Sequence, residues 1–319
     1  MGRALYIGAL CVALTLVAGC HKAEETLRIG TNVWPGYEPL YLARDLGYFD
    51  DTAVHLVEYT SATQVLAAYR NGGIDAAALT LDEMIQLATH GTPPELVLVM
   101  DVSDGADAVL GRANVRTLAD LAGRRIGVEN TALGGYMLSR TLEHGKLSRS
   151  DIEVVTLTVD EHERAFLNGD VDAVVTFEPV SSRLKNAGAV LLFDSSGIPG
   201  EVVDVLVVRP EFRKAHRDTV GEVLDAWFQA VDFLETRPDE AARYMKRRLR
   251  LSEADILTAF ETLRIPDCDE NRALLLGTPA PIESTMQHLM KVMSGNRQIA
   301  APVPTEGIVK ASFVSEPGY

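Results

Sequence analysis

The side chains best placed for chemistry in this sequence are hydroxyls, amides, carboxylates and aromatic rings next to short apolar runs. The seven histidines are scattered without the spacing of metal ligands, and the sequence has no nucleophile elbow or phosphate loop. The chemistry that remains is holding a small molecule, without a cofactor or a metal. The candidate ligand contacts are Asn32, Trp34, Tyr37, Ser61, Thr63, Thr80, Asp82, Asp101, Asn130, Thr131, Phe177, Glu178 and Asp204.

The types of these side chains narrow the ligand. Trp34 and Phe177 are candidate aromatic walls, on which a planar or cationic ligand stacks with about 0.5–2 kcal/mol. Ser61, Thr80 and Asn130 stand at expected helix starts, whose free N–H groups hold anions, although plain capping also explains them. The set contains four carboxylates and no Arg or Lys. It therefore favours an amine or a ring N–H, while the helix starts leave a sulfonate or nitrate open.

The strands beside these side chains belong to two similar units. Residues 171–175 form a short β-branched run, typical of a strand buried on both faces, and Asn168-Gly169 ends the helix before it. Residues 71–80 repeat this pattern 97 positions earlier, and Arg28-Ile29-Gly30 recurs as Arg125-Ile126-Gly127 at the same offset. One echo would be ordinary turn sequence, but a constant offset indicates a duplication. The strand ends of both units are then expected to face one cleft.

The pattern predicts an α/β fold of two lobes joined by two crossings, which together form a hinge. The strand at 106–110 is assigned to lobe I, the region 210–293 is helical, and the tail from Ser294 returns to lobe I. Asp160 is expected to cap a helix, which puts His162 in a solvated first turn. The predicted boundaries are lobe I at 27–112 and 204–319, lobe II at 113–203, and crossings near 111–124 and 194–203.

The N-terminal residues 1–20 predict an export signal that is not part of the fold. Arg3, an apolar run to Val17 and the end Leu16-Val17-Ala18-Gly19-Cys20 resemble a bacterial lipoprotein signal, which makes Cys20 the acylated first residue and 21–26 a tether. The apolar run is shorter than the roughly 20 residues of a membrane span. With Cys11 removed and Cys20 acylated, Cys268 has no disulfide partner. The net charge of −15 argues against nucleic acid as a partner.

Several segments resemble a known family. The Trp34-Pro35-Gly36-Tyr37 loop, the stretch 118–127 (LADLAGRRIG) and Thr176-Phe177-Glu178-Pro179 are similar to solute-binding proteins of bacterial ABC importers, in the branch for nitrate, sulfonates, taurine and the pyrimidine precursor of thiamin. The resemblance covers roughly residues 27 to 290. It implies a type II periplasmic binding fold in a monomer that is lipid-anchored at the periplasmic face of a bacterial membrane and delivers its closed form to an ABC permease. By position, the family touches ligand at Trp34, the Ser61 loop, Thr80-Leu81-Asp82, Asn130 and Phe177-Glu178.

Two other functions stay open. An extracytoplasmic sensor lobe would present its closed form to a signalling partner, and only a neighbouring permease gene would separate it from an importer component. An enzyme on the same fold, like family relatives that make a thiamin pyrimidine, would carry a Cys-rich motif that this sequence lacks. We therefore expect a binding protein and no enzyme. Glu178→Gln is expected to weaken ligand binding without unfolding the chain.

Overall fold

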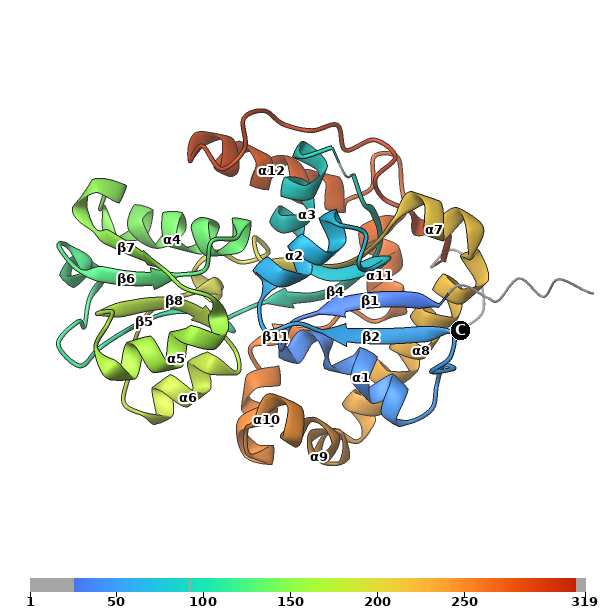
Figure 1. Cartoon of the computed structure of the whole chain (residues 1–319), viewed down its shortest axis with the longest axis horizontal. Coiled ribbons are helices and arrows are strands. Elements are labelled where there is room, and N and C mark those ends of the chain that lie inside the picture. Colours follow the sequence, from blue (N-terminus) through green and yellow to red (C-terminus); the bar gives the residue numbers. More distant parts are fainter. Residues whose placement is uncertain (1–25, 92, 314–319) are drawn as a thin grey trace, which may run out of the picture.

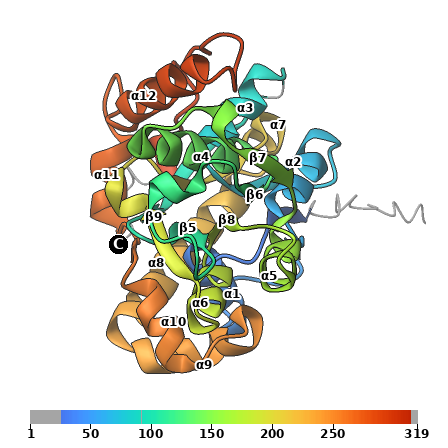
Figure 2. The ribbon, with the colours of Figure 1, turned by 90° about the vertical axis from the view of Figure 1, so that its left-hand side faces the viewer.

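The computed structural model describes residues 26–313 except residue 92, so the predicted signal, Cys20 and residues 21–25 of the tether lie outside the described residues. Two α/β lobes lie side by side (Figure 1), as the sequence predicts. Helices cover both faces of each sheet, which Figure 2 shows for the smaller lobe. Over the described range, no helix is long and apolar enough to cross a membrane.

Lobe I is the part of the chain built on the six-stranded sheet, with strand order β11-β4-β10-β3-β1-β2. Its strands are β1 (Leu27–Thr31), β2 (Val54–Glu58), β3 (Ala76–Thr80), β4 (Glu95–Ser103), β10 (Val203–Val208) and β11 (Leu263–Arg264). Its helices are α1 (Glu38–Asp45), α2 (Ala62–Arg70), α3 (Leu81–Thr89), α7 (Pro210–Ala215), α8 (Arg217–Thr236), α9 (Pro238–Leu249), α10 (Glu253–Phe260), α11 (Cys268–Leu275) and α12 (Ile282–Gly295). The helical region at 210–293 is thus confirmed, interrupted by the short strand β11.

Lobe II is built on the five-stranded sheet, with strand order β7-β6-β8-β5-β9. Its strands are β5 (Asp107–Gly111), β6 (Arg125–Val128), β7 (Glu153–Thr156), β8 (Ala173–Phe177) and β9 (Val190–Asp194). Its helices are α4 (Ala132–Gly145), α5 (Val159–Asn168) and α6 (Val180–Asn186). Short 3-10 turns complete the two lobes at Pro35–Tyr37, Leu118–Leu121, Arg149–Asp151, Ser195–Gly197 and Ala311–Phe313.

The two lobes share a topology, and the same internal contact occurs in both. In lobe I, Arg28 Nε donates to Asp75 Oδ2 over 2.8 Å, and in lobe II Arg125 Nε donates to Asp172 Oδ2 over 3.3 Å. Each pair ties one strand, β1 or β6, to the turn before its parallel neighbour, β3 or β8, and the two pairs are 97 positions apart in sequence. Gly169 ends α5 at φ 82°, the left-handed helix end predicted from the sequence. These repeated contacts support the duplication.

The strand at 106–110 was assigned to the wrong lobe by the sequence pattern. β5 pairs antiparallel with β8 and β9 and so belongs to lobe II, whereas β10 pairs antiparallel with β3 and β4 of lobe I. The first crossing therefore falls at 104–106, before the predicted 111–124. An apolar strand looks the same in either sheet, because its partners are distant in sequence.

The two crossings touch each other through a buried serine pair. Ser195 Oγ lies 2.8 Å from Ser103 Oγ and accepts the Gly105 N–H over 2.7 Å, and both serines are fully buried. Gly105 has φ +117°, a conformation that favours glycine. The hinge is thus a hydrogen-bonded unit of two chain segments that are far apart in sequence.

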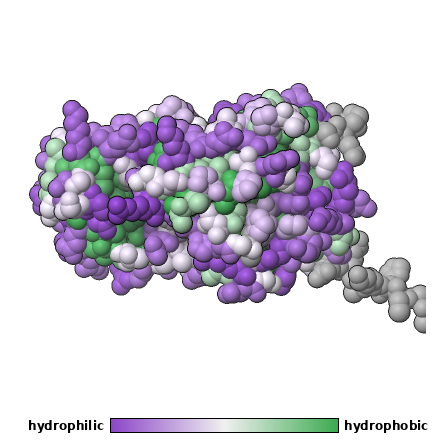
Figure 3. Space-filling model, turned by 90° about the horizontal axis from the view of Figure 1, so that it is seen from above, coloured by the Kyte–Doolittle hydropathy of each residue, from purple (hydrophilic) through white to green (hydrophobic). Residues whose placement is uncertain are grey.

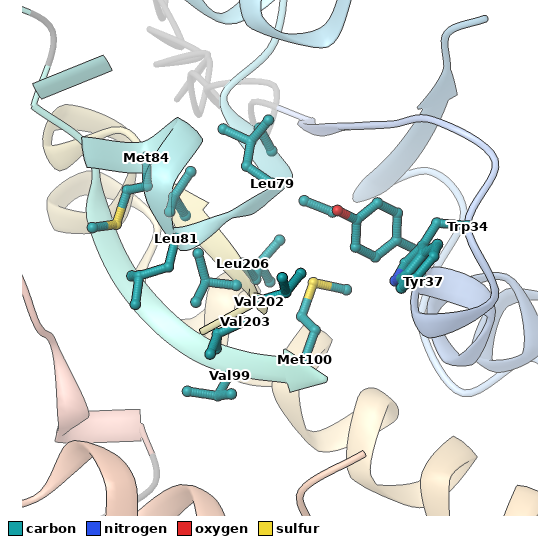
Figure 4. Packing of buried hydrophobic residues seen from close by; sticks show 14 of the residues in the cluster. Trp34, Tyr37, Leu79, Leu81, Met84, Val99, Met100, Val202, Val203 and Leu206 are labelled. Atoms are coloured by element: carbon teal, nitrogen blue, oxygen red, sulfur yellow. The ribbon is translucent and has the colours of Figure 1, made fainter. Parts of the chain in front are cut away.

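The core of lobe I packs next to the residues of the cleft. Leu79 of β3, Val99 of β4 and Leu206 of β10 are fully or almost fully buried, and Trp34 and Tyr37 lie together beside this cluster (Figure 4). The tail from Ser294 returns to lobe I as predicted, through an isolated bridge between Leu96 and Val309. The face seen from above is mostly hydrophilic, with smaller apolar areas over lobe II and the middle of the molecule (Figure 3).

Ser195→Ala is expected to lower the free energy of unfolding by about 1–3 kcal/mol, because the buried Gly105 N–H and the Ser103 hydroxyl lose a partner. Urea denaturation at equilibrium measures the loss. The exposed neighbour Ser196→Ala is the control, with a change within about 0.5 kcal/mol. Equal stability of the two variants would contradict the role given to this contact.

Candidate functional site

A cavity lies between the lobes, where strands β1, β3, β6 and β8 end. Its volume is about 30 Å³, room for little more than a water molecule, so a larger ligand enters only when the lobes or the lining side chains move. The lining comes from both sheets, as the sequence predicts for the cleft. It consists of Asn32, Trp34, Tyr37, Ala62, Thr80, Glu83, Asp107, Glu129, Thr131, Leu133, Gly134, Met137, His162, Val175, Thr176, Phe177 and Asp204.

The structure brings about half of the predicted contacts to this cavity. Those that line it are Asn32, Trp34, Tyr37, Thr80, Thr131, Phe177 and Asp204. Those that do not are Ser61, Thr63, Asp82, Asp101, Asn130 and Glu178. The predicted aromatic walls meet across the cleft, since the rings of Trp34 and Phe177 are 5.6 Å apart in a T-shaped contact at 84°. Helix α4 is capped by Thr131, and Asn130 beside it is exposed.

Two aspartates form the floor of the cleft on the lobe I side. Asp101 and Asp204 are register partners on β4 and β10, and both are almost fully buried. Trp34 Nε1 donates to Asp101 Oδ2 over 2.9 Å, and the Tyr37 hydroxyl donates to Asp204 Oδ1. A Cβ on Gly36 would lie 1.8 Å from Asp101 Oδ2, so only glycine allows this approach. Burial raises the pKa of Asp101 to about 7 and that of Asp204 well above its usual range.

Three further acids lie at the same edge of the cleft. Burial raises the pKa of Asp82 to about 6 and that of Asp107 to about 7, and burial together with the neighbouring Asp82 raises the pKa of Glu83 to about 8. Glu83 also completes a capping box at the start of α3 by accepting the Thr80 N–H. Within the described part of the chain, no donor reaches Asp82 Oδ2, Glu83 Oε1, Asp101 Oδ1 or Asp107 Oδ2. These oxygens are unused acceptors.

Lobe II contributes a buried histidine that the sequence placed in solvent. The cap of α5 is Thr158, two residues before the predicted cap Asp160, and Glu161 completes the capping box. His162 therefore turns inward. His162 is 1% exposed, and its Nδ1 lies 3.1 Å from Thr176 Oγ1. Burial lowers the pKa of His162 to about 4, so the ring is neutral at pH 7. It adds no positive charge to the cleft.

Glu178 does not reach the cavity. Its carboxylate accepts hydrogen bonds from the Ser181 hydroxyl over 2.5 Å and the Ser182 N–H over 3.1 Å, and it pairs with Lys185 at 3.4 Å. The acid therefore organises the first turn of α6. The expectation that Glu178→Gln weakens ligand binding assumed a direct contact with the ligand, which this geometry does not support. The substitution is instead expected to lower the stability of the first turn of α6.

The acids that sequence reasoning missed had weak signals of their own. Glu129 directly precedes the predicted helix start at Asn130, and its position after β6 was the available clue. Glu83 stands three residues after Thr80, where capping of the helix is enough to explain an acid. Asp107 was missed because its strand was placed in the other lobe. Only the lateral pairing of the strands shows that the start of antiparallel β5 lies at the carboxyl end of β8.

Two α/β lobes of one topology around a lined cleft define the type II periplasmic binding protein fold that the resemblance implied. The chain belongs to the NMT1-like family, whose model matches residues 21–249.

Known proteins similar to this chain include binding proteins and an enzyme. A Bacillus subtilis (strain 168) protein named as an aliphatic sulfonates-binding protein is 26% identical over 250 residues, covering 73% of this chain and 75% of that protein. The structure of the alkanesulfonate-binding protein SsuA from Xanthomonas axonopodis pv. citri bound to MOPS has a TM-score of 0.76 at 21% identity, over 90% of this chain and 98% of that one. The desulfurization enzyme DSZB has a TM-score of 0.65 at 19% identity, over 90% and 97%. The fold and the sequence relatives support a solute-binding role.

The raised pKa values predict that stability falls as pH rises. A carboxyl whose pKa is higher in the folded than in the unfolded chain stabilises the fold below pH about 4, and this contribution is lost as pH passes the folded value. For Asp82, Asp101, Asp107 and Glu83 those values are about 6 to about 8. The free energy of unfolding should therefore decrease from pH 5 to pH 8, as measured by urea denaturation.

Asp107→Asn isolates one of these groups. The amide carries no charge, so the variant should be more stable than wild type by about 1–3 kcal/mol at pH 8 and show no such gain at pH 5. The exposed Asp51→Asn is the control and should leave the pH dependence unchanged. A gain of the same size at both pH values would remove the charge as the cause.

Proposed function

We propose that this chain is an extracytoplasmic solute-binding lipoprotein that captures a small cationic molecule, an amine or a nitrogen heterocycle, and delivers it to an ABC permease. The observation that carries the ligand class is the set of acidic side chains in the cleft. Among the described residues that line the cavity there are four acids (Glu83, Asp107, Glu129 and Asp204) and no Lys or Arg. Asp82 and Asp101 lie buried close behind them.

Simple electrostatics separates the ligand classes. Two unit charges about 5 Å apart interact with about 3 kcal/mol at an effective dielectric constant of about 20. A sulfonate would add such a repulsion for each ionised acid that it approaches. An ammonium or ring N–H instead supplies the donors that Glu83 Oε1 and Asp107 Oδ2 lack. The cleft thus favours a ligand that brings positive charge and hydrogen-bond donors together.

Specific observations favour three other functions. The names of the relatives and the helix starts at the cleft favour a sulfonate. The shared fold of DSZB favours an enzyme. The described part of this chain contains one cysteine, Cys268, which lies outside the cavity lining, so no described thiol faces the cavity. The two-lobed form alone would also suit a sensor lobe. Lipid anchoring at Cys20, a single copy of the chain and a periplasmic location rest on the sequence pattern at residues 16–20 and on the fold class.

Calorimetric titration with two probes of equal chain length and opposite charge, and with one nitrogen heterocycle, tests the ligand class. Butylamine and a 4-aminopyrimidine should bind, whereas butane-1-sulfonate should give no heat of binding. The affinity for butylamine should rise from pH 5 to pH 8, because the cation binds ionised carboxylates and so releases protons from groups with pKa values of about 6 to about 8. Binding of butane-1-sulfonate in preference to butylamine would overturn the proposed ligand class.

Asp107→Asn should weaken butylamine binding about tenfold, because one cavity-lining acid loses its charge. Asp51→Asn, on the surface of lobe I, removes the same charge far from the lining and should leave the affinity unchanged. Native mass spectrometry of the purified protein then identifies which small molecule it carries. Unaltered affinity in Asp107→Asn would exclude this acid from the site.

A further inference from the structure

Glu129 of lobe II reaches across the cleft to the first turn of a helix in lobe I. It directly follows β6, is 4% exposed and lines the cavity. Its Oε1 accepts the Thr63 backbone N–H over 3.0 Å and the Thr63 hydroxyl over 2.7 Å. One carboxylate oxygen therefore holds two donors that belong to the opposite lobe.

The position that Glu129 occupies is one where anions bind. Thr63 is the second residue of α2, a nine-residue helix capped by Ser61, whose side chain accepts the Gln64 N–H over 3.4 Å. The N–H groups of a first helical turn have no partner within the helix and carry the positive end of its dipole. The Thr63 N–H is satisfied by a carboxylate of the protein itself. An anionic ligand would have to displace Glu129 from this turn.

Other polar contacts that join the lobes include three hydrogen bonds away from the cavity. Asn296 Nδ2 donates to Ser139 Oγ over 2.9 Å. Gln298 Nε2 donates to Ala132 O over 2.9 Å beside α4, and Arg183 reaches Leu249 O at 3.5 Å near α9. Neither Gln298 nor Arg183 lines the cavity. Glu129 is thus placed both to hold the lobes together and to set the charge at the cleft.

The surroundings of Glu129 oppose a second anion. Glu83 of α3 faces the same cavity, and electrostatic repulsion between Glu83 and Glu129 raises the pKa of Glu83 further. The other lining acids are Asp107 and Asp204, and the lining histidine, His162, is neutral at pH 7. A free anion at the start of α2 would therefore have to take the place of Glu129, in a cavity whose described lining includes Glu83 and contains no Lys or Arg.

We propose that Glu129 determines ligand specificity, because it latches the lobes together through Thr63 and fills the anion position of α2 with a carboxylate of the protein. The proposal rests on the proposed function and extends it by naming the residue that rejects sulfonates. It also explains how a chain similar in fold to sulfonate-binding proteins can select the opposite charge. The positive end of α2 in this chain is already matched by a carboxylate of the protein itself.

Three variants separate closure from charge. Glu129→Ala removes the latch and the carboxylate, Glu129→Gln keeps a hydrogen-bond acceptor of the same shape, and Thr63→Val removes one donor while the carboxylate stays. Glu153→Gln is the matched control, an exposed acid on β7 of the same lobe. Circular dichroism melts first establish that each variant is folded, and Glu129→Gln carries the test if Glu129→Ala is not.

Small-angle X-ray scattering of the full mature protein measures closure, and calorimetry with sodium sulfate and butane-1-sulfonate measures anion binding. Glu129→Ala should have a larger radius of gyration than wild type and bind both anions at least tenfold more tightly. Glu129→Gln should gain anion binding with a smaller opening. Thr63→Val should open without gaining anions, and Glu153→Gln should match wild type.

The proposal is overturned if Glu129→Ala scatters like wild type, or if it opens but binds the two anions no better. Scattering is measured without any ligand, so it tests the latch independently of the proposed function. Binding of butane-1-sulfonate by the wild-type protein would instead refute the proposed ligand class. In that case the radius of gyration of Glu129→Ala still decides whether Glu129 holds the lobes together.

Discussion

The structure depends on how a narrow gap between two lobes accommodates buried carboxyl groups without a basic side chain in its lining. Removing carboxylates from water is costly, and the cost grows when several acids share one site. Three features offset this cost: burial raises the pKa of groups such as Asp101, Trp34 and Tyr37 donate hydrogen bonds to the two floor aspartates, and the start of α2 receives Glu129. A raised pKa lowers the negative charge that faces the gap, while the hydrogen bonds and the helix start stabilise the charge that stays. A cationic ligand would complete the same compensation.

The residues that repeat between the two lobes have a different role from those that do not. The pairs Arg28–Asp75 and Arg125–Asp172 repeat with equal spacing because they stabilise each sheet from within. The cleft residues do not repeat in kind: lobe I supplies Glu83 and Asp204, while lobe II supplies Asp107, Glu129, a neutral His162 and hydroxyls. Structural contacts follow the repeat, and binding contacts depart from it. The charge of the site is therefore a property of this chain beyond its fold.

Local sequence signals predicted the elements well and their partners less well. The buried strand at β8 and the helix end at Gly169 follow from residue types alone, because they depend on adjacent residues. The lobe to which β5 belongs could not be predicted from the sequence, since sheet pairing joins segments that are distant in sequence. Glu178 was placed in the cleft because it follows a strand end, but Ser181 and Lys185 compete for it. Glu129 was overlooked because its partner Thr63 lies 66 positions away.

The placement of β10 has a consequence for how this chain acquires its shape. All strands of lobe II come from one continuous stretch, 107–194, whereas β10 at 203–208 lies between β3 and β4 in the middle of the lobe I sheet. As the polypeptide emerges from a ribosome or a secretion channel, the first strands made cannot complete their sheet until the entire second lobe has been synthesised. Domains otherwise tend to fold from the N-terminus onward. Here the order is reversed, and the lobe begun first is finished last.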